Sequence, residues 1–137
     1  MSTEKYQKEA LNKTDLSKSA FKFRFWQPST QTMQKWEDYI QYGIFEMFNN
    51  CDSIPLLSSG FNDKKGVEIF QGDICKYHKS TSKWLVSYHF EVRFKNGCFY
   101  AFWEREMMGK HEEHWDLLCQ KDLRNIRVVS NIFQSEQ

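Results

Sequence analysis

The chain has 137 residues and a mass of 16.6 kDa, which fits a single domain. Its 19 Lys and Arg residues nearly balance 18 Asp and Glu residues, which argues against both a strongly basic nucleic-acid binder and an acidic mimic of DNA. Aromatic residues make up 17% of the chain, so large rings must supply much of the core. Residues 1–20 contain no apolar run typical of a signal peptide, and no membrane span is evident, so we expect a cytoplasmic protein.

Four cysteines, Cys51, Cys75, Cys98 and Cys119, are widely spaced and form no Cys-x-x-Cys pair. Zinc sites usually take two ligands from one tight turn, and this geometry is missing. We therefore expect four reduced, structural cysteines and no metal or other cofactor.

The amino-terminal residues 1–20 form a polar arm in which Tyr6, Ala10 and Leu11 would share a helical face. Both an arm ordered on a neighbouring surface and a disordered arm are compatible with this pattern. Residues 21–26 alternate aromatic and basic side chains and predict a strand. Apolar residues then recur in steps of three and four, which predicts a helix over 33–48, at Met33, Trp36, Ile40, Ile44 and Met47.

The middle of the chain is rich in turn signals. Short apolar segments at 54–57, 67–70 and 74–77 are separated by turns, and the glycines at 60, 66 and 72 predict a positive φ or a bulge.

Residues 84–104 give the clearest strand signal. Every second residue from Trp84 to Phe94 is apolar, which predicts one buried and one solvated face. Asn96 and Gly97 then predict a type I′ hairpin turn. The returning strand 98–103 has rings on both faces, so we expect it to be covered on both sides, by a barrel interior and another element or by a second subunit.

The carboxyl-terminal part predicts a short helix over 112–123, a final strand over 126–133 and a polar tail at 134–137. His111 and His114 lie three residues apart and do not match the i, i+4 spacing of a zinc protease. With Cys119 they form a weak candidate metal set, whose alternative is an exposed helix start. The carboxylates Asp63, Glu68 and Asp73 could serve acid–base chemistry, but Asp beside turn glycines typically bonds its own backbone.

Residues 59–77 resemble the signature of the YopX family, T-G-L-x-D-x-x-G-x-E-I-Y-E-G-D-I-V. Residues 21–26 are similar to the family's K-F-R-x-W segment, and residues 128–133 to its closing V-I-G-N-I-Y. Ser59, Phe61, Cys75 and Ser130 depart from these patterns. The resemblance implies a bacteriophage or prophage protein with a β-barrel-like core, helical additions and a tendency to form homo-oligomers. It supplies no catalytic residues.

We therefore expect an α+β fold: a small, curved, barrel-like antiparallel sheet with two or three helical additions in one domain at 21–133. The expected function is non-enzymatic: an accessory or regulatory phage-derived protein that binds as a homo-oligomer to a protein target in the host bacterial cytoplasm, such as a defence or replication component. The alternative is a nucleic-acid-binding module, because rings and basic residues interleave at 21–26 and 88–100. A metal- or carboxylate-dependent hydrolase is a third reading.

The expected binding residues are Arg24, Trp26, Tyr100 and Phe102. The expected structural turn residues are Gly60, Asp63, Gly66, Gly72, Asp73 and Asn131. Arg24 would be structural if its guanidinium paired with Asp63 or Asp73. Subunit contacts are expected from Tyr100, Phe102, Trp36 or the arm around Tyr6 and Leu11.

Overall fold

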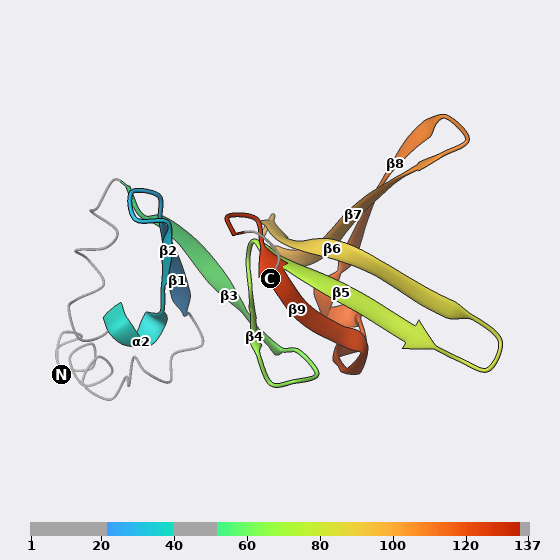
Figure 1. Ribbon diagram of the computed structural model, residues 1–137, viewed down its shortest axis with the longest axis horizontal. Helices are drawn as coiled ribbons and strands as arrows, with labels where there is room; N and C mark the ends of the chain where they lie inside the picture. The colour runs from blue at the N-terminus through green and yellow to red at the C-terminus, as the bar shows by residue number, and fades with distance from the viewer. Residues whose placement is uncertain (1–21, 40–51, 135–137) are drawn as a thin grey trace, which may run out of the picture. The chain divides into compact units, whose positions relative to one another are not determined.

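The computed structural model describes residues 22–39 and 52–134 (Figure 1). The chain divides at Pro55 into two compact units, residues 1–55 and 56–137. This division falls inside the domain that we expected over 21–133. The predicted arm at 1–20, Cys51 and the end of the tail at 135–137 lie outside the described residues.

The first unit contains a short hairpin. Strand β1 (Phe23–Gln27) pairs antiparallel with β2 (Thr32–Gln34), and the four-residue helix α2 (Trp36–Tyr39) follows. The strand predicted at 21–26 is thus confirmed over its described part. The helix predicted over 33–48 is wrong at its start, because Gln31 adopts a φ of 53° and turns the chain so that Met33 pairs with Trp26. Residues 40–48 of that helix lie outside the described residues.

The second unit is built on antiparallel strands. Strand β3 (Ile54–Asn62) pairs with β4 (Glu68–Phe70). A five-stranded sheet follows in the order β8-β7-β6-β5-β9. Its members are β5 (Asp73–Ser80), β6 (Leu85–Lys95), β7 (Cys98–Met107), β8 (Lys110–Leu117) and β9 (Ile126–Asn131). The sheet is curled, and the β7–β8 hairpin diverges from the β5–β6 hairpin (Figure 1).

The fold is therefore mostly β, and the expected α+β class with two or three helical additions overstates its helical content. In the described residues, helical structure consists of α2 and two 3₁₀ turns, η2 (Leu118–Gln120) and η3 (Leu123–Asn125).

The helix predicted over 112–123 is wrong. The first half of this segment belongs to strand β8, which pairs with β7 from Met107↔Lys110 to Tyr100↔Leu117. Met108 and Gly109, with φ values of 53° and 74°, make the tight turn that starts the hairpin. Long-range pairing with β7 outweighs the spacing of the few apolar residues in the segment, which only by coincidence resembles that of a helix.

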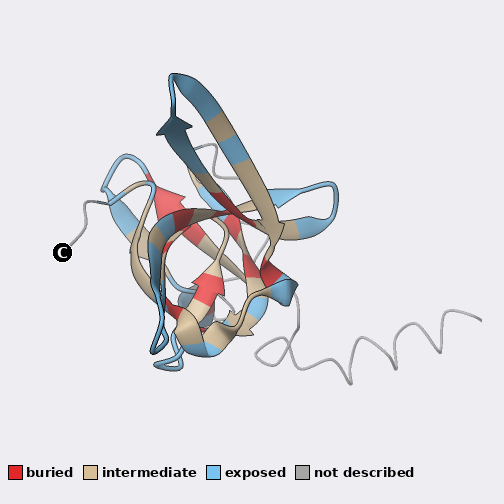
Figure 2. Cartoon of the chain, turned by 90° about the vertical axis from the view of Figure 1, so that its right-hand side faces the viewer, coloured by how far each residue is buried: buried red, intermediate tan, exposed pale blue. Residues whose placement is uncertain are grey.

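The hairpin turn predicted at Asn96 and Gly97 is confirmed, with φ values of 53° and 80°. The expected alternation along β6 holds in its middle, where Phe90 and Val92 are buried, but not at its ends. Trp84, which precedes β6, is 70% exposed, and Phe94 is also exposed. The hairpins extend beyond the core, so their ends are solvated (Figure 2).

The core of the second unit lies on one face of the five-stranded sheet, which we call the core face. Its buried residues come from strands β4 to β7, from β9 and from η2: Ile69, Cys75, Phe90, Val92, Ala101, Leu118 and Ile126. The opposite face is called the outward face. Cys75 fits the expected structural role, whereas Cys98 and Cys119 are exposed, so burial does not explain them.

Candidate functional site on the outward face of the five-stranded sheet

The turn motif between β3 and β4 is organised by Asp63, whose side chain is buried. Oδ1 accepts hydrogen bonds from the backbone N–H groups of Lys65 (2.8 Å) and Val67 (2.9 Å), and Oδ2 accepts one from Val128 on β9 (2.9 Å). This carboxylate therefore ties the turn to β9 through three backbone donors, in the structural role predicted for it.

A second junction involves Gly72 and Asp73, which connect β4 to the sheet. The N–H of Gly72 donates to the carbonyl of Val92, and its own carbonyl accepts from the N–H of Ile132, both at 2.8 Å. Gly72 has a φ of 89°, a left-handed conformation that favours glycine. Asp73 Oδ2 accepts a hydrogen bond from the N–H of Phe70 at 2.8 Å.

The remaining turn residues behave similarly. Gly60 and Gly66 have φ values of 80° and 82°, as their positions predict. Asn131 Oδ1 accepts hydrogen bonds from the N–H groups of Phe133 (3.0 Å) and Gln134 (2.9 Å) and so closes the turn after β9. The signature of this chain encodes backbone geometry rather than reagents.

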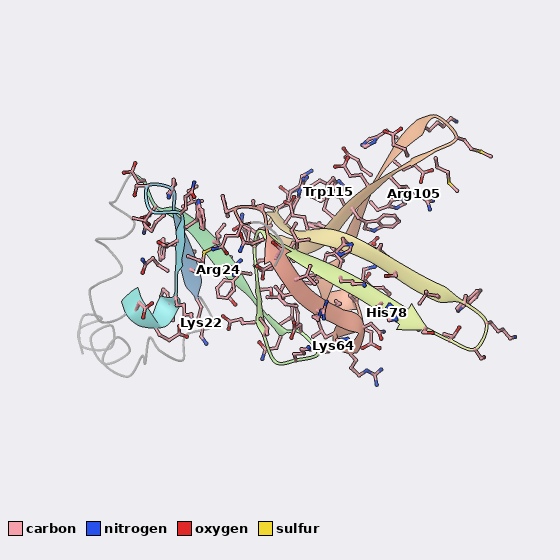
Figure 3. All side chains as sticks on the ribbon, in the orientation of Figure 1. Lys22, Arg24, Lys64, His78, Arg105 and Trp115 are labelled. Atoms are coloured by element: carbon pink, nitrogen blue, oxygen red, sulfur yellow. The ribbon has the colours of Figure 1, made fainter. Side chains whose placement is uncertain are left out.

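The outward face carries a cluster of aromatic rings and cations at the base of the β7–β8 hairpin. The Arg93 guanidinium lies 3.6 Å from the centroid of the Phe102 ring and 5.3 Å from that of Trp115. Lys95 Nζ lies 4.8 Å from the Trp115 ring on the same face. Tyr100 meets Trp115 edge-on at 5.8 Å. We call Arg93, Lys95, Tyr100, Phe102 and Trp115 the basic-aromatic end; Trp115 is labelled in Figure 3.

A cavity of about 300 Å³ adjoins this cluster, with Arg93, Lys95 and Trp115 in its lining together with Gln71 and Ile132. Arg93 is held in place by Glu91, which accepts from its Nε at 2.8 Å and from its Nη2 at 3.3 Å. A guanidinium held in place beside aromatic rings is typical of residues that dominate protein interfaces.

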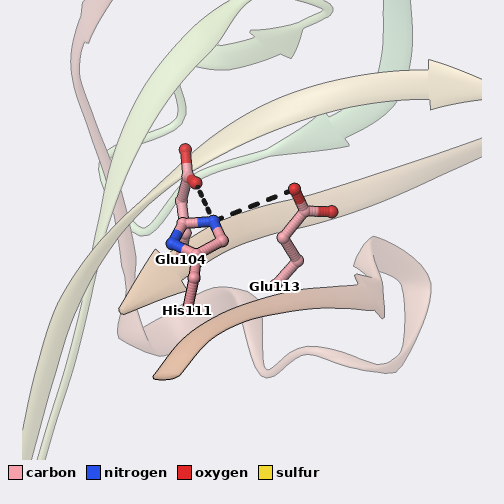
Figure 4. Close-up of side chains that lie close together, drawn as sticks. All are labelled: Glu104, His111 and Glu113. Carbon is pink, nitrogen blue, oxygen red and sulfur yellow. Dashed lines mark ion pairs between the residues drawn. The ribbon is translucent and has the colours of Figure 1, made fainter. Parts of the chain in front are cut away.

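Further along the same face, the hairpin becomes acidic. Glu104 and Glu113 lie opposite each other across β7 and β8, and Glu106 lies opposite His111. His111 Nε2 is 2.8 Å from Glu104 and 3.9 Å from Glu113 (Figure 4). Its Nδ1 is 3.2 Å from Glu106. We call these four residues the acidic end. All are exposed, and in the described part of the chain they supply the set of side chains with metal-ligating spacing: Glu104, His111 and Glu113.

The candidate metal set of His111, His114 and Cys119 is not assembled. His111 and His114 lie three positions apart on a strand, so their side chains point to opposite faces. His114 instead stacks on Trp103 at 4.0 Å, on the core face. The alternative, an exposed helix start, is wrong as well, because this segment is strand β8.

The core face of the sheet carries a ladder of rings across four strands. Tyr77, Tyr88, Trp103 and His114 stack in turn, with centroid separations of 5.2, 4.9 and 4.0 Å.

Lys121 and Asp116 form polar contacts with two rings of this ladder, Tyr88 and Trp103. Lys121 Nζ donates to the Tyr88 hydroxyl at 2.7 Å and lies 3.0 Å from Asp116, which also accepts from Trp103 Nε1 at 3.1 Å. Burial acts to raise the pKa of Asp116, but the hydrogen bonds from Trp103 and Lys121 outweigh it and lower the pKa. Burial likewise acts to lower the pKa of Lys121, and its bonds to Tyr88 and Asp116 raise it.

The four binding residues that the sequence predicts belong to two different units of the chain. Arg24 and Trp26 are in β1 of the first unit, where Trp26 is 7% exposed, and Tyr100 and Phe102 are in β7. Tyr100 is half-buried, whereas Phe102 is only 5% exposed and packs under Arg93 and Trp115. Strand 98–103 is therefore covered on both sides at Ala101 and Phe102, as expected, by side chains of this chain.

Of the expected subunit contacts, Trp36 is buried, and Tyr6 and Leu11 lie outside the described residues. The pairing of Arg24 with Asp63 or Asp73 stays a prediction.

The sequence did not predict that Arg93, Lys95 and Trp115 lie on one surface. The alternation along 84–94 already placed Arg93 on the solvated face. The missing signal was Gly109, which with Met108 marks a second hairpin turn and brings Trp115 opposite Phe102.

The sequence model of the YopX protein family matches residues 31–137, so the chain belongs to the YopX family. The match begins after the segment at 21–26 that resembles the family's opening motif. Among solved structures, the crystal structure of protein EF1440 from Enterococcus faecalis is similar, with a TM-score of 0.49 and 17% identity over 82% of this chain and 93% of that one. No curated protein matches. In the described residues, no helix is long and apolar enough to cross a membrane.

Proposed function

We propose that this protein is a non-enzymatic binding protein that acts as a homo-oligomer, and that two copies pair through their β8 strands. The observation that carries this proposal is the charge pattern of the outward face. An acidic end and a basic-aromatic end lie in succession along the β7–β8 hairpin.

Strand β8 is an edge of the five-stranded sheet in the described residues. An edge strand presents backbone N–H and C=O groups that can pair with another strand, and proteins either protect such edges or use them for association. Antiparallel pairing of two identical edges around a two-fold axis gives a closed dimer with the same surface on both copies.

Such pairing would place the acidic end of one copy beside the basic-aromatic end of the other. On β8 the outward residues run from His111 and Glu113 to Trp115 and Leu117, so an antiparallel partner brings Glu113 close to Trp115 and its cations. Because the two copies are related by a two-fold axis, the dimer would contain this contact between Glu113 of one copy and the cations of the other at two places. Glu104, directly across from Glu113, is a like charge that an approaching cation would compensate.

The family resemblance supports a phage or prophage protein. We propose in addition that its target is a protein of the bacterial cytoplasm. The cavity beside Arg93 and Trp115 would offer that target a pocket with the composition of an interface hot spot. Asp63 and Asp73, two of the three carboxylates considered for acid–base chemistry, accept hydrogen bonds from backbone N–H groups, which supports a structural role for them.

A charge-swap experiment with light scattering tests the homo-oligomer. The wild type should have a mass above the 16.6 kDa of one chain. Glu113→Arg should reduce it to a monomer, because the new cation faces Lys95 and Arg93 of the other copy. Adding Lys95→Glu to this variant should restore the oligomer.

Lys83→Glu is the matched control, since Lys83 is an exposed cation near the turn between β5 and β6, and this variant should keep the wild-type mass. A monomeric wild type would exclude the homo-oligomer. An oligomer unaffected by Glu113→Arg would exclude pairing through β8.

A further inference from the structure

A second site lies away from the β7–β8 hairpin, where the signature turn meets strands β5 and β9. It is a cavity of about 240 Å³, roughly eight times the ~30 Å³ that one water occupies in the liquid. Its lining is basic and polar and comes from three separate segments: Lys64, Lys76, His78, Asn125 and Arg127. No carboxylate is part of that lining among the residues that the structure describes.

The signature turn positions the first of these cations. Asp63 accepts the N–H of Val128, and the N–H of Lys64 donates to the carbonyl of Ile126 at 3.0 Å. Both bonds attach the turn to β9, and Lys64 follows Asp63 directly. The motif that defines the turn thus brings Lys64 to the cavity, and Figure 3 labels it together with His78 of β5.

The other two cations, Lys76 and Arg127, lie side by side on neighbouring strands. Lys76 on β5 is the direct register partner of Arg127 on β9, so their side chains leave the same face at neighbouring positions. Like charges at directly opposed positions destabilise an antiparallel pair. Such a pair is best explained by an anion that binds between the two cations.

Neighbouring acids do not neutralise this group. Asp63 uses its oxygens for three backbone donors, and Asp122 holds Arg124, whose Nη2 lies 2.9 Å from its Oδ2. Within the described residues, the side chains of Lys64, Lys76 and Arg127 form no ion pair or hydrogen bond. Three cations therefore meet at one cavity with their donors available.

We propose that this cavity binds a phosphate group, with Arg127 and Lys76 as the charged clamp, Lys64 as the third cation, and His78 and Asn125 as additional hydrogen-bonding groups. The planar guanidinium of Arg127 can offer two parallel N–H donors to phosphate oxygens, and lysine supplies a point charge. The phosphate could belong to a small phosphorylated ligand or to the backbone of a single-stranded nucleic acid.

Isothermal titration with inorganic phosphate, and separately with oligothymidylate, tests the site at constant ionic strength. At least one of the two ligands should bind the wild-type chain. Arg127→Gln and Lys76→Gln should each weaken binding about tenfold or more, as expected for loss of a charge-assisted hydrogen bond. Lys83→Gln, which removes an exposed cation near the β5–β6 turn, should bind like the wild type.

Thermal unfolding provides the second readout. Without ligand, both variants should melt at or above the wild-type temperature, because each removes a repulsion between Lys76 and Arg127. Phosphate should raise the melting temperature of the wild type and not that of the variants.

Binding of phosphate alone would identify a small phosphorylated ligand, and tighter binding of oligothymidylate would identify nucleic acid; either outcome supports a phosphate site. The proposal is overturned if neither ligand binds, if the variants bind like the wild type, or if chloride raises the melting temperature as much as phosphate does.

Discussion

Replacing Asp63 should destabilise the second unit more than replacing other turn carboxylates does. Asp63 is only 6% exposed and accepts three backbone hydrogen bonds, at 2.8, 2.9 and 2.9 Å. Asp63→Asn keeps the oxygen that serves Lys65 and Val67 and turns an NH₂ group toward the N–H of Val128. One buried donor is then left without an acceptor, which costs about 2 kcal/mol.

Asp63→Ala removes both acceptor oxygens, leaves three backbone donors without a partner and should cost about 4 kcal/mol or more, a large share of the roughly 5–15 kcal/mol that stabilises a domain. Asp122→Asn is the matched control. Asp122 also accepts a backbone N–H, from Arg124, but at an exposed position where water can take the place of the carboxylate, so Asp122→Asn should lower stability much less than Asp63→Asn does.

Urea unfolding followed by Trp fluorescence measures these differences, with the midpoint falling in the order wild type, Asp122→Asn, Asp63→Asn, Asp63→Ala at an unchanged slope. If Asp63→Asn unfolded at the same urea concentration as the wild type, the bond between the turn and β9 would not contribute as we argue.

Three further predictions concern other parts of the chain. Gly72→Ala should destabilise by about 1–2 kcal/mol in the same urea assay, because the added Cβ meets Ile132 at an ordinary 3.5 Å and the cost comes from the left-handed backbone; no change in midpoint would contradict this. Trp103→Phe should raise the pKa of Asp116 in an NMR titration of the carboxyl carbon, since the indole N–H bonds to its ionised form. Because the folded pKa of Asp116 lies below its ordinary value of 3.8, its contribution to stability is present above that value and is lost as the pH falls through the folded pKa. Metal analysis of the purified protein should find no stoichiometric metal ion. One bound metal ion per chain that is lost in the His111→Ala variant would contradict this prediction and place a metal site at the acidic end.

The strands were predictable wherever local signals agreed with the pairing. Asn96 and Gly97 fix the β6–β7 turn by their backbone preference, so the hairpin follows from the sequence. The positive φ values of Gly60, Gly66 and Gly72 and the backbone bonds of Asp63 followed from the same reasoning.

The predictions failed where pairing between distant residues decides the structure. Apolar spacing predicted a helix from Glu112, yet the segment pairs with β7, and Met108 was not an obvious turn residue because its positive φ is uncommon for a side chain of this kind. Both candidate sites depend on register. Arg93 meets Trp115, and Lys76 meets Arg127, only after the strands are aligned, and no local pattern contains that information.

Amide hydrogen exchange, measured by mass spectrometry at low and high protein concentration, tests the central claim that β8 pairs between two copies. We predict that residues 110–117 exchange more slowly as the protein concentration rises, whereas residues 126–131, at the other edge of the sheet, exchange at the same rate. Equal exchange of residues 110–117 at both concentrations, from a chain whose mass stays at 16.6 kDa, would contradict it.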